Sequence, residues 1–129
     1  MILDTSAVLT IVFGEPGNEF FVEAIATAPS CRISAATFLE ASIIAESRGG
    51  DLAIRQCDSF FRESRISVES FTEEQALLAR QAYSEYGKGR HPAGLNFGDC
   101  FSYALAKSTG EPLLFKGSDF SQTDIQSGL

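Results

Sequence analysis

Short apolar runs alternate with stretches of helical spacing along this chain of 129 residues. The apolar runs predict strands at residues 2–4, 32–34, 65–70 and 112–115. The spacing of apolar residues between them predicts helices at 5–13, 18–27, 35–48, 51–64, 72–86 and 96–108. Gly49-Gly50 and Gly110 are typical helix stops, Asn96 is a typical helix cap, and Thr72 with Gln75 forms a capping-box signal. The pattern is that of an α/β protein.

Short apolar strands separated by helices favour a parallel sheet that is covered on both faces. We therefore predict one α/β domain spanning residues 1–129, with three α/β/α layers and a central parallel sheet of four to five strands. Ligands of such folds bind at the carboxyl ends of the strands. Asp4 ends the first predicted strand and Asp119 lies just beyond the last, so both lie where an active site is expected.

Composition narrows the class of protein. At 44% hydrophobic and 21% charged residues, the chain has an ordinary globular composition. Its three cysteines are odd in number and lack metal-ligand spacing, which predicts buried thiols in a reducing compartment. The sequence shows no basic, apolar leader and no apolar run of membrane-spanning length, so we expect a cytoplasmic protein. The net charge of −7 argues against non-specific nucleic-acid binding.

Four acidic residues stand in places that ordinary surface acids avoid. Glu40 lies in a helix that is apolar nearly all round, which predicts burial, unless it occupies a single solvated stripe. Asp99 follows Asn96 by three residues among aromatic neighbours, where the helix dipole alone also favours an acid. Asp4 is equally suited to capping the helix that follows it, and Asp119 to a turn. The constellation, rather than any one residue, indicates a site.

Carboxylates gathered at strand ends and inside apolar helices repel one another unless a cation compensates them. Mg²⁺ and Mn²⁺ prefer oxygen ligands and bind through a few carboxylates, water and substrate phosphate. Zinc is not expected, because His91 is the only histidine and no cysteine pair has ligand spacing. A divalent ion of this kind polarises phosphoryl oxygens and lowers the pKa of water. It also reconciles an acidic pocket with an anionic substrate.

The same residues carry a family pattern. MILDTSAVLTIVFGEPG, ISAATFLEASIIAESRGG and YGKGRHPAGLNFGDCFSYALAKSTGEPLLFKGSDFSQTDI occur in this order and cover nearly the whole chain. Together they resemble the PIN-domain toxins of the VapC type. The opening Asp-Thr-Ser-Ala, the acid within the second motif, the Gly-Asp pair and the closing Lys-Gly-x-Asp-Phe carry the resemblance.

The resemblance implies a Mg²⁺- or Mn²⁺-dependent endoribonuclease, the toxin of a type II toxin–antitoxin system. It places the acidic quartet on Asp4, Glu40, Asp99 and Asp119, both as catalytic residues and as metal ligands. Close relatives often have two acids before the closing Phe, whereas Ser118 precedes Asp119 here, and a further acid, Asp124, lies five residues later. It also implies a VapB-type antitoxin that inserts a basic residue into the acidic site, and a homodimer or a higher complex with the antitoxin.

Other interpretations of the residues remain open. Lys88, Arg90 and Lys116 are candidates for binding RNA, although a loop of this composition is also typical of a solvated connection. A phosphatase with an Asp nucleophile needs a second acid two residues later, where this chain has Ser6. A non-catalytic PIN-like module that only docks partners is the second alternative, and the presence of all four acids argues against it.

Overall fold

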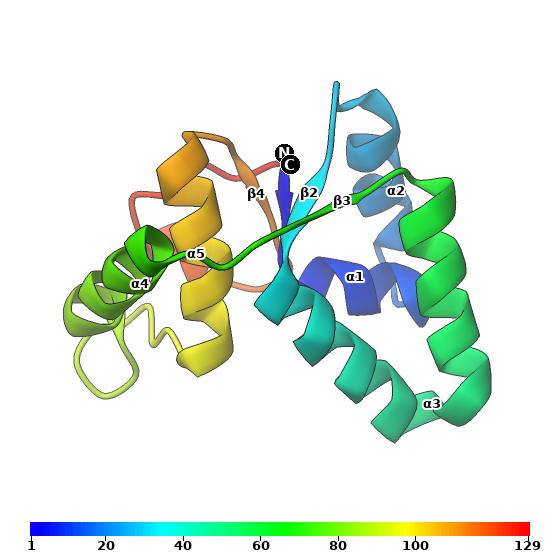
Figure 1. Ribbon diagram of the computed structural model, residues 1–129, viewed down its shortest axis with the longest axis horizontal. Helices are drawn as coiled ribbons and strands as arrows, with labels where there is room; N and C mark the ends of the chain where they lie inside the picture. Colours follow the sequence, from blue (N-terminus) through cyan, green and yellow to red (C-terminus); the bar gives the residue numbers. More distant parts are fainter.

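The computed structural model describes residues 1–129. Elements of helix and strand alternate along the chain (Figure 1). In order they are β1 (Ile2–Leu3), α1 (Thr5–Val12), α2 (Asn18–Thr27), β2 (Arg32–Ser34), α3 (Ala35–Glu63), β3 (Ser67–Glu69), α4 (Glu73–Tyr86), α5 (Phe97–Thr109), β4 (Leu113–Leu114) and the short 3₁₀ helix η1 (Phe120–Gln122). None of the helices combines the length and the apolar character needed to cross a membrane.

The four strands form one parallel sheet in the order β3-β2-β1-β4. Ile2 of β1 is in register with Arg32 on one side and Leu113 on the other. Beyond β4, Leu113 also makes an isolated parallel bridge to Ser127, so the end of the chain adds one further contact at this edge. The predicted parallel sheet is confirmed, with four strands.

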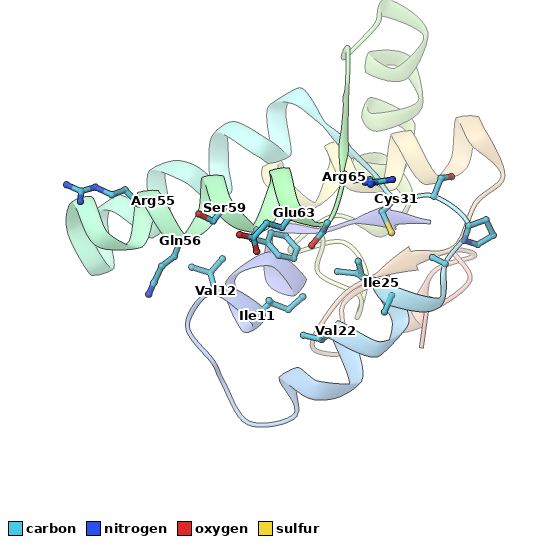
Figure 2. A pocket seen from close by; sticks show the side chains of 16 residues that line it. Ile11, Val12, Val22, Ile25, Cys31, Arg55, Gln56, Ser59, Glu63 and Arg65 are labelled. Carbon is cyan, nitrogen blue, oxygen red and sulfur yellow. The ribbon is translucent and has the colours of Figure 1, made fainter.

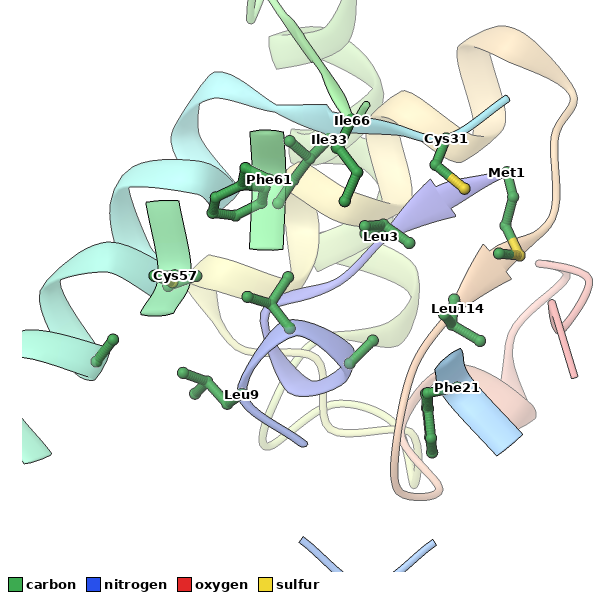
Figure 3. Close-up of a cluster of buried hydrophobic side chains, with 14 of the residues drawn as sticks. Met1, Leu3, Leu9, Phe21, Cys31, Ile33, Cys57, Phe61, Ile66 and Leu114 are labelled. Atoms are coloured by element: carbon green, nitrogen blue, oxygen red, sulfur yellow. The ribbon is translucent and has the colours of Figure 1, made fainter. Parts of the chain in front are cut away.

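Alternation along the strands directs side chains to two separate cores. Leu3, Ile33 and Leu114 face one way, into a cluster that α1, α2 and α3 complete (Figure 3). Ile2 and Leu113 face the other way, among side chains of α4 and α5. Helices therefore cover both faces of the sheet, with α1–α3 on one side and α4–α5 on the other (Figure 1). This confirms the three-layer α/β/α architecture, and all three cysteines are free and buried, as predicted.

Of two local signals in the sequence, the helix stop at Gly49-Gly50 is present in full and the capping box at Thr72 only in part. Gly50 has φ 64° and ψ −153° and breaks α3 into two arms, so the stop predicted at Gly49-Gly50 is confirmed (Figure 1). The capping box predicted at Thr72 is only half present. Thr72 accepts a hydrogen bond from the backbone N–H of Gln75, but the Gln75 side chain donates to the Ser70 carbonyl instead of returning to Thr72.

Candidate active site

Asp4 follows β1 directly and serves two purposes at once. Its side chain caps α1 by accepting a hydrogen bond from the Ser6 N–H at 3.1 Å. The same oxygen accepts the Ser6 hydroxyl at 2.6 Å, and the other oxygen accepts the buried Ser102 hydroxyl of α5 at 2.6 Å. The side chain is only 4% exposed. The capping interpretation is thus correct, and Asp4 also lies at the carboxyl end of the central strand.

Glu40 reaches the same place from α3. Its Oε1 accepts the Thr5 hydroxyl at 2.5 Å, and its carboxylate lies against the first turn of α5. There, a Cβ atom added to Gly98 would lie 2.2 Å from Glu40 Oε2. The absence of a side chain at position 98 is therefore what lets the Glu40 carboxylate approach α5.

The prediction that the helix around Glu40 is buried nearly all round is wrong. Leu39 and Ile43 are each 57% exposed, and Glu40 itself is half-buried. The apolar character of this helix arm instead gives an apolar outer surface, which is the kind of surface that proteins use for association.

Asp99 lies in the first turn of α5 and forms a complete capping box with Asn96. Asp99 Oδ2 accepts the Asn96 N–H at 3.0 Å, and Asn96 Oδ1 accepts the Asp99 N–H at 2.9 Å. Burial raises the pKa of Asp99 to about 7, against the hydrogen bond from the Asn96 backbone, and the negative charges of Asp4, Asp119 and Glu40 add to the rise. Asp99 therefore stands in the electrostatic field of the other three acids.

The structure separates Asp119 from its competitor Asp124. Asp119 is exposed before η1, and its charge reaches Asp99. The carboxylate of Asp124 is held on the far part of α5, where it accepts the Tyr103 hydroxyl at 2.7 Å and pairs with Lys107 Nζ at 2.5 Å. Of the two acids, Asp119 is the one whose charge acts on Asp99.

A cleft of about 380 Å³ brings three of the four acids together. Asp4, Glu40 and Asp99 line it, and its only Lys or Arg side chains are Arg48 and Lys116. Of the three predicted RNA-binding residues, Lys116 lies here, with its Nζ 3.1 Å from Glu15 Oε2. The other two, Lys88 and Arg90, are exposed on the loop between α4 and α5 and do not line the cleft.

The donor set of this cleft fits a hard divalent cation. It offers carboxylate oxygens from Asp4, Glu40 and Asp99, and no histidine or cysteine lines it. No group of three or more acidic, His or Cys side chains is close enough to hold an ion as it stands. Mg²⁺ usually takes only one or two carboxylates and completes its shell with water and substrate phosphate, so binding does not require three converging side chains.

Comparison with known proteins identifies the family. The family model "PIN domain" matches residues 1–126. "Ribonuclease VapC" of Mycolicibacterium smegmatis is 47% identical over 125 residues, which cover 97% of each chain. "Ribonuclease VapC30" of Mycobacterium tuberculosis is 45% identical over 125 residues, 97% of this chain and 95% of the relative. This chain is a PIN-domain protein of the VapC family.

Solved structures share the PIN fold at lower sequence identity. VapC20 of Mycobacterium tuberculosis, a "Sarcin-Ricin loop cleaving toxin", superposes with a TM-score of 0.78 and 18% identity over 96% of this chain and 95% of its own. A "toxin-antitoxin complex from Klebsiella pneumoniae" gives a TM-score of 0.68 and 19% identity over 95% and 92%. Both support the three-layer architecture described above.

Several residues of this PIN-domain site were not anticipated from the sequence. Thr5 and Ser102 hold the carboxylates of Glu40 and Asp4. No local signal points to Ser102, because its partner lies 98 residues away along the chain. Arg48 could have been found, since it stands eight residues after Glu40 and therefore falls close to the same face of an α-helix.

Proposed function

We propose that this chain is a divalent-metal-dependent endoribonuclease, the toxin of a type II toxin–antitoxin system, with Asp4, Glu40, Asp99 and Asp119 as its acidic quartet. The observation that carries the proposal is the cleft of about 380 Å³ that Asp4, Glu40 and Asp99 line together, with Asp119 near enough for its charge to act on Asp99. VapC ribonucleases at 45–47% identity over the whole chain supply the reaction class. Ribonucleases of this family generally depend on a divalent metal, and we propose Mg²⁺ or Mn²⁺ here.

The chain's own groups divide the work around the substrate. A bound divalent ion supplies a Lewis acid for a phosphoryl oxygen and lowers the pKa of water. Asp4 is oriented by Ser6 and Ser102, and Glu40 by Thr5, so both carboxylates are fixed before substrate arrives. Asp99 would hold such an ion in its carboxylate form, which a pKa of about 7 makes accessible near neutral pH.

Cleavage of RNA under metal control tests the proposal directly. Purified protein should cut an end-labelled single-stranded RNA in Mg²⁺ or Mn²⁺ and should stop cutting in EDTA, because oxygen ligands hold these ions reversibly. Returning either ion to the chelated sample should restore cutting, which shows that the protein has stayed folded. Undiminished cleavage in EDTA would contradict the metal mechanism.

We propose that an antitoxin binds this protein and inhibits its ribonuclease activity. A hollow of about 1000 Å³ runs between α1, α2 and the second arm of α3, and apolar side chains make up half of its lining (Figure 2). Ile11, Val12, Val22 and Ile25 stand along it, and Val22 is 47% exposed. Such a groove suits an apolar helix with anchors at i, i+4 and i+7. A basic residue of the same antitoxin then enters the acidic cleft, where a guanidinium can pair with a carboxylate through two hydrogen bonds.

Placing a charge in the groove should separate inhibition from catalysis. Val22→Asp should weaken binding of the antitoxin by at least about tenfold, as the loss of a good apolar anchor does. RNA cleavage by the free enzyme should stay unchanged, because Val22 does not line the acidic cleft. Leu52→Asp is the matched control, since Leu52 is 66% exposed on α3 outside the groove. Equal effects of both variants on affinity, measured by calorimetry, would contradict the assignment.

A second copy of the chain is also expected, and the exposed apolar surface supports it. Leu39 and Ile43 lie four residues apart on α3, and Phe97 at the start of α5 is 75% exposed. Exposed apolar residues of this size at one edge of a site are typical of an association surface. We propose that two copies of the chain associate through the surface that includes Leu39, Ile43 and Phe97, both in the free protein and in the complex with the antitoxin.

A further inference from the structure

Arg48 lines the acidic cleft, although it belongs neither to the proposed quartet nor to the predicted RNA-binding residues. Glu40, Ile44 and Arg48 follow one another at four-residue intervals along the first arm of α3, and all three line the cleft. Eight residues of α-helix rise about 12 Å. Arg48 therefore stands on the wall of the cleft with its backbone about two helical turns from that of Glu40.

The two cations of this cleft differ in their partners. Lys116 is engaged by Glu15, with 3.1 Å between Nζ and Oε2. Arg48 makes no ion pair and no side-chain hydrogen bond, although Asp4, Glu15, Glu40 and Asp99 line the same cleft. An exposed, unpaired guanidinium in an acid-lined cleft keeps all of its donors available for an anion.

The backbone around Arg48 holds the residue in place. The first arm of α3 ends directly after it, at the non-helical Gly50. Gly49 packs so tightly that an added Cβ would lie 2.6 Å from the Cβ of Ala53 and 3.2 Å from the ring of Phe13. Close packing against the residue that caps α1 fixes the end of this arm, so Arg48 projects from a defined point rather than from a mobile loop.

We propose that Arg48, at the end of the first arm of α3, binds a backbone phosphate of the RNA substrate. The proposal rests on the ribonuclease function proposed above and adds a phosphate site to it. A guanidinium presents a planar fork that matches two phosphate oxygens, and it stays charged at every physiological pH. The net charge of the protein is −7, so the surface as a whole repels a polyanion. An unpaired arginine inside the cleft provides a local positive charge that attracts one.

Steady-state cleavage at several salt concentrations tests this site in the active, metal-loaded enzyme. A phosphate contact far from the reacting atoms contributes equally to ground state and transition state, so Arg48→Gln should raise KM about three- to tenfold with little change in kcat. Each contact to single-stranded nucleic acid contributes about 0.7 to the slope of log affinity against log salt. The slope of log KM against log salt should therefore be about 0.7 smaller in Arg48→Gln than in the wild type. In Arg48→Lys it should equal that of the wild type.

Arg62→Gln is the matched control, because Arg62 is exposed on the second arm of α3 and lines neither the cleft nor the groove. Identical KM and salt slope in Arg48→Gln and Arg62→Gln would overturn the phosphate site. A lowered melting temperature in Arg48→Gln with an unchanged salt slope would also overturn it, in favour of a cation that only stabilises a helix end. Wild-type protein that cuts no RNA would instead overturn the proposed function, and the phosphate site with it.

Discussion

Asp99→Asn is expected to lower the rate of RNA cleavage by at least about a hundredfold, the scale on which enzymes lose rate when one electrostatic group at the reacting centre is removed. The protein should nevertheless fold. An asparagine Oδ1 can still accept the Asn96 N–H, so the capping box that begins α5 keeps its geometry. What the substitution removes is a negative charge that lies in the field of Asp4, Asp119 and Glu40.

The same variant should gain stability in the absence of metal, and the gain should depend on pH. Burial and the neighbouring acids raise the pKa of Asp99 from 3.8 to about 7 in the folded protein. Between these two values Asp99 binds more protons in the folded state than in the unfolded state, so its contribution to the stability of the wild type falls as pH rises from about 4 to about 7. Asparagine does not titrate. In EDTA, the melting temperature of Asp99→Asn should therefore exceed that of the wild type by more at pH 8 than at pH 5.

Asp124→Asn provides the matched control for both measurements. Asp124 is an acid of the same type, but hydrogen bonds from Lys107 and Tyr103 lower its pKa against the effect of burial. Its ionised form stabilises the fold at neutral pH, so Asp124→Asn should lose stability above the unfolded pKa and keep its activity. Activity that survives in Asp99→Asn and is lost in Asp124→Asn would show that the quartet has been misassigned.

The layers of this fold could be predicted because they depend on local pattern. Apolar runs bounded by turn residues mark the strands, and the predicted bounds of the segment from Arg32 to Ser34 and of the helix from Asn18 to Thr27 match the structure. Gly50 marks the break in α3 by its backbone conformation. Parallel pairing then follows, since each strand is connected to its neighbours through helices.

The side-chain environment of each acid could not be predicted in the same way. Leu39 and Ile43 are apolar residues of the kind found in buried helices. They are exposed because no other element of the chain packs over that side of α3. Ser102 binds Asp4 across 98 residues of sequence. Asp119 and Asp124 both follow the last strand, and the ion pair between Asp124 and Lys107 is not visible in the sequence. Such contacts arise from tertiary packing.

Gly98→Ala should lower the rate of RNA cleavage by about ten- to a hundredfold, which is typical when a residue that orients a metal ligand is changed. A Cβ at position 98 would lie 2.2 Å from Oε2 and 2.8 Å from Cδ of Glu40. The obstacle is the far end of a flexible side chain, so the Glu40 carboxylate can swing away and the fold survives. Alanine in place of a helical glycine adds up to about 1 kcal/mol of helix propensity, so the melting temperature should hold or rise while activity falls.

A double-mutant cycle distinguishes displacement of Glu40 from a general disturbance of α5. Glu40→Asp shortens the acid by one methylene, which withdraws the carboxylate from Gly98 and makes room for the new methyl group. The effects of Gly98→Ala and Glu40→Asp on kcat/KM should therefore be far from additive, because both act through the position of one carboxylate. Additive losses, or Gly98→Ala with the full activity of the wild type, would mean that the close approach of Glu40 to α5 has no part in the reaction.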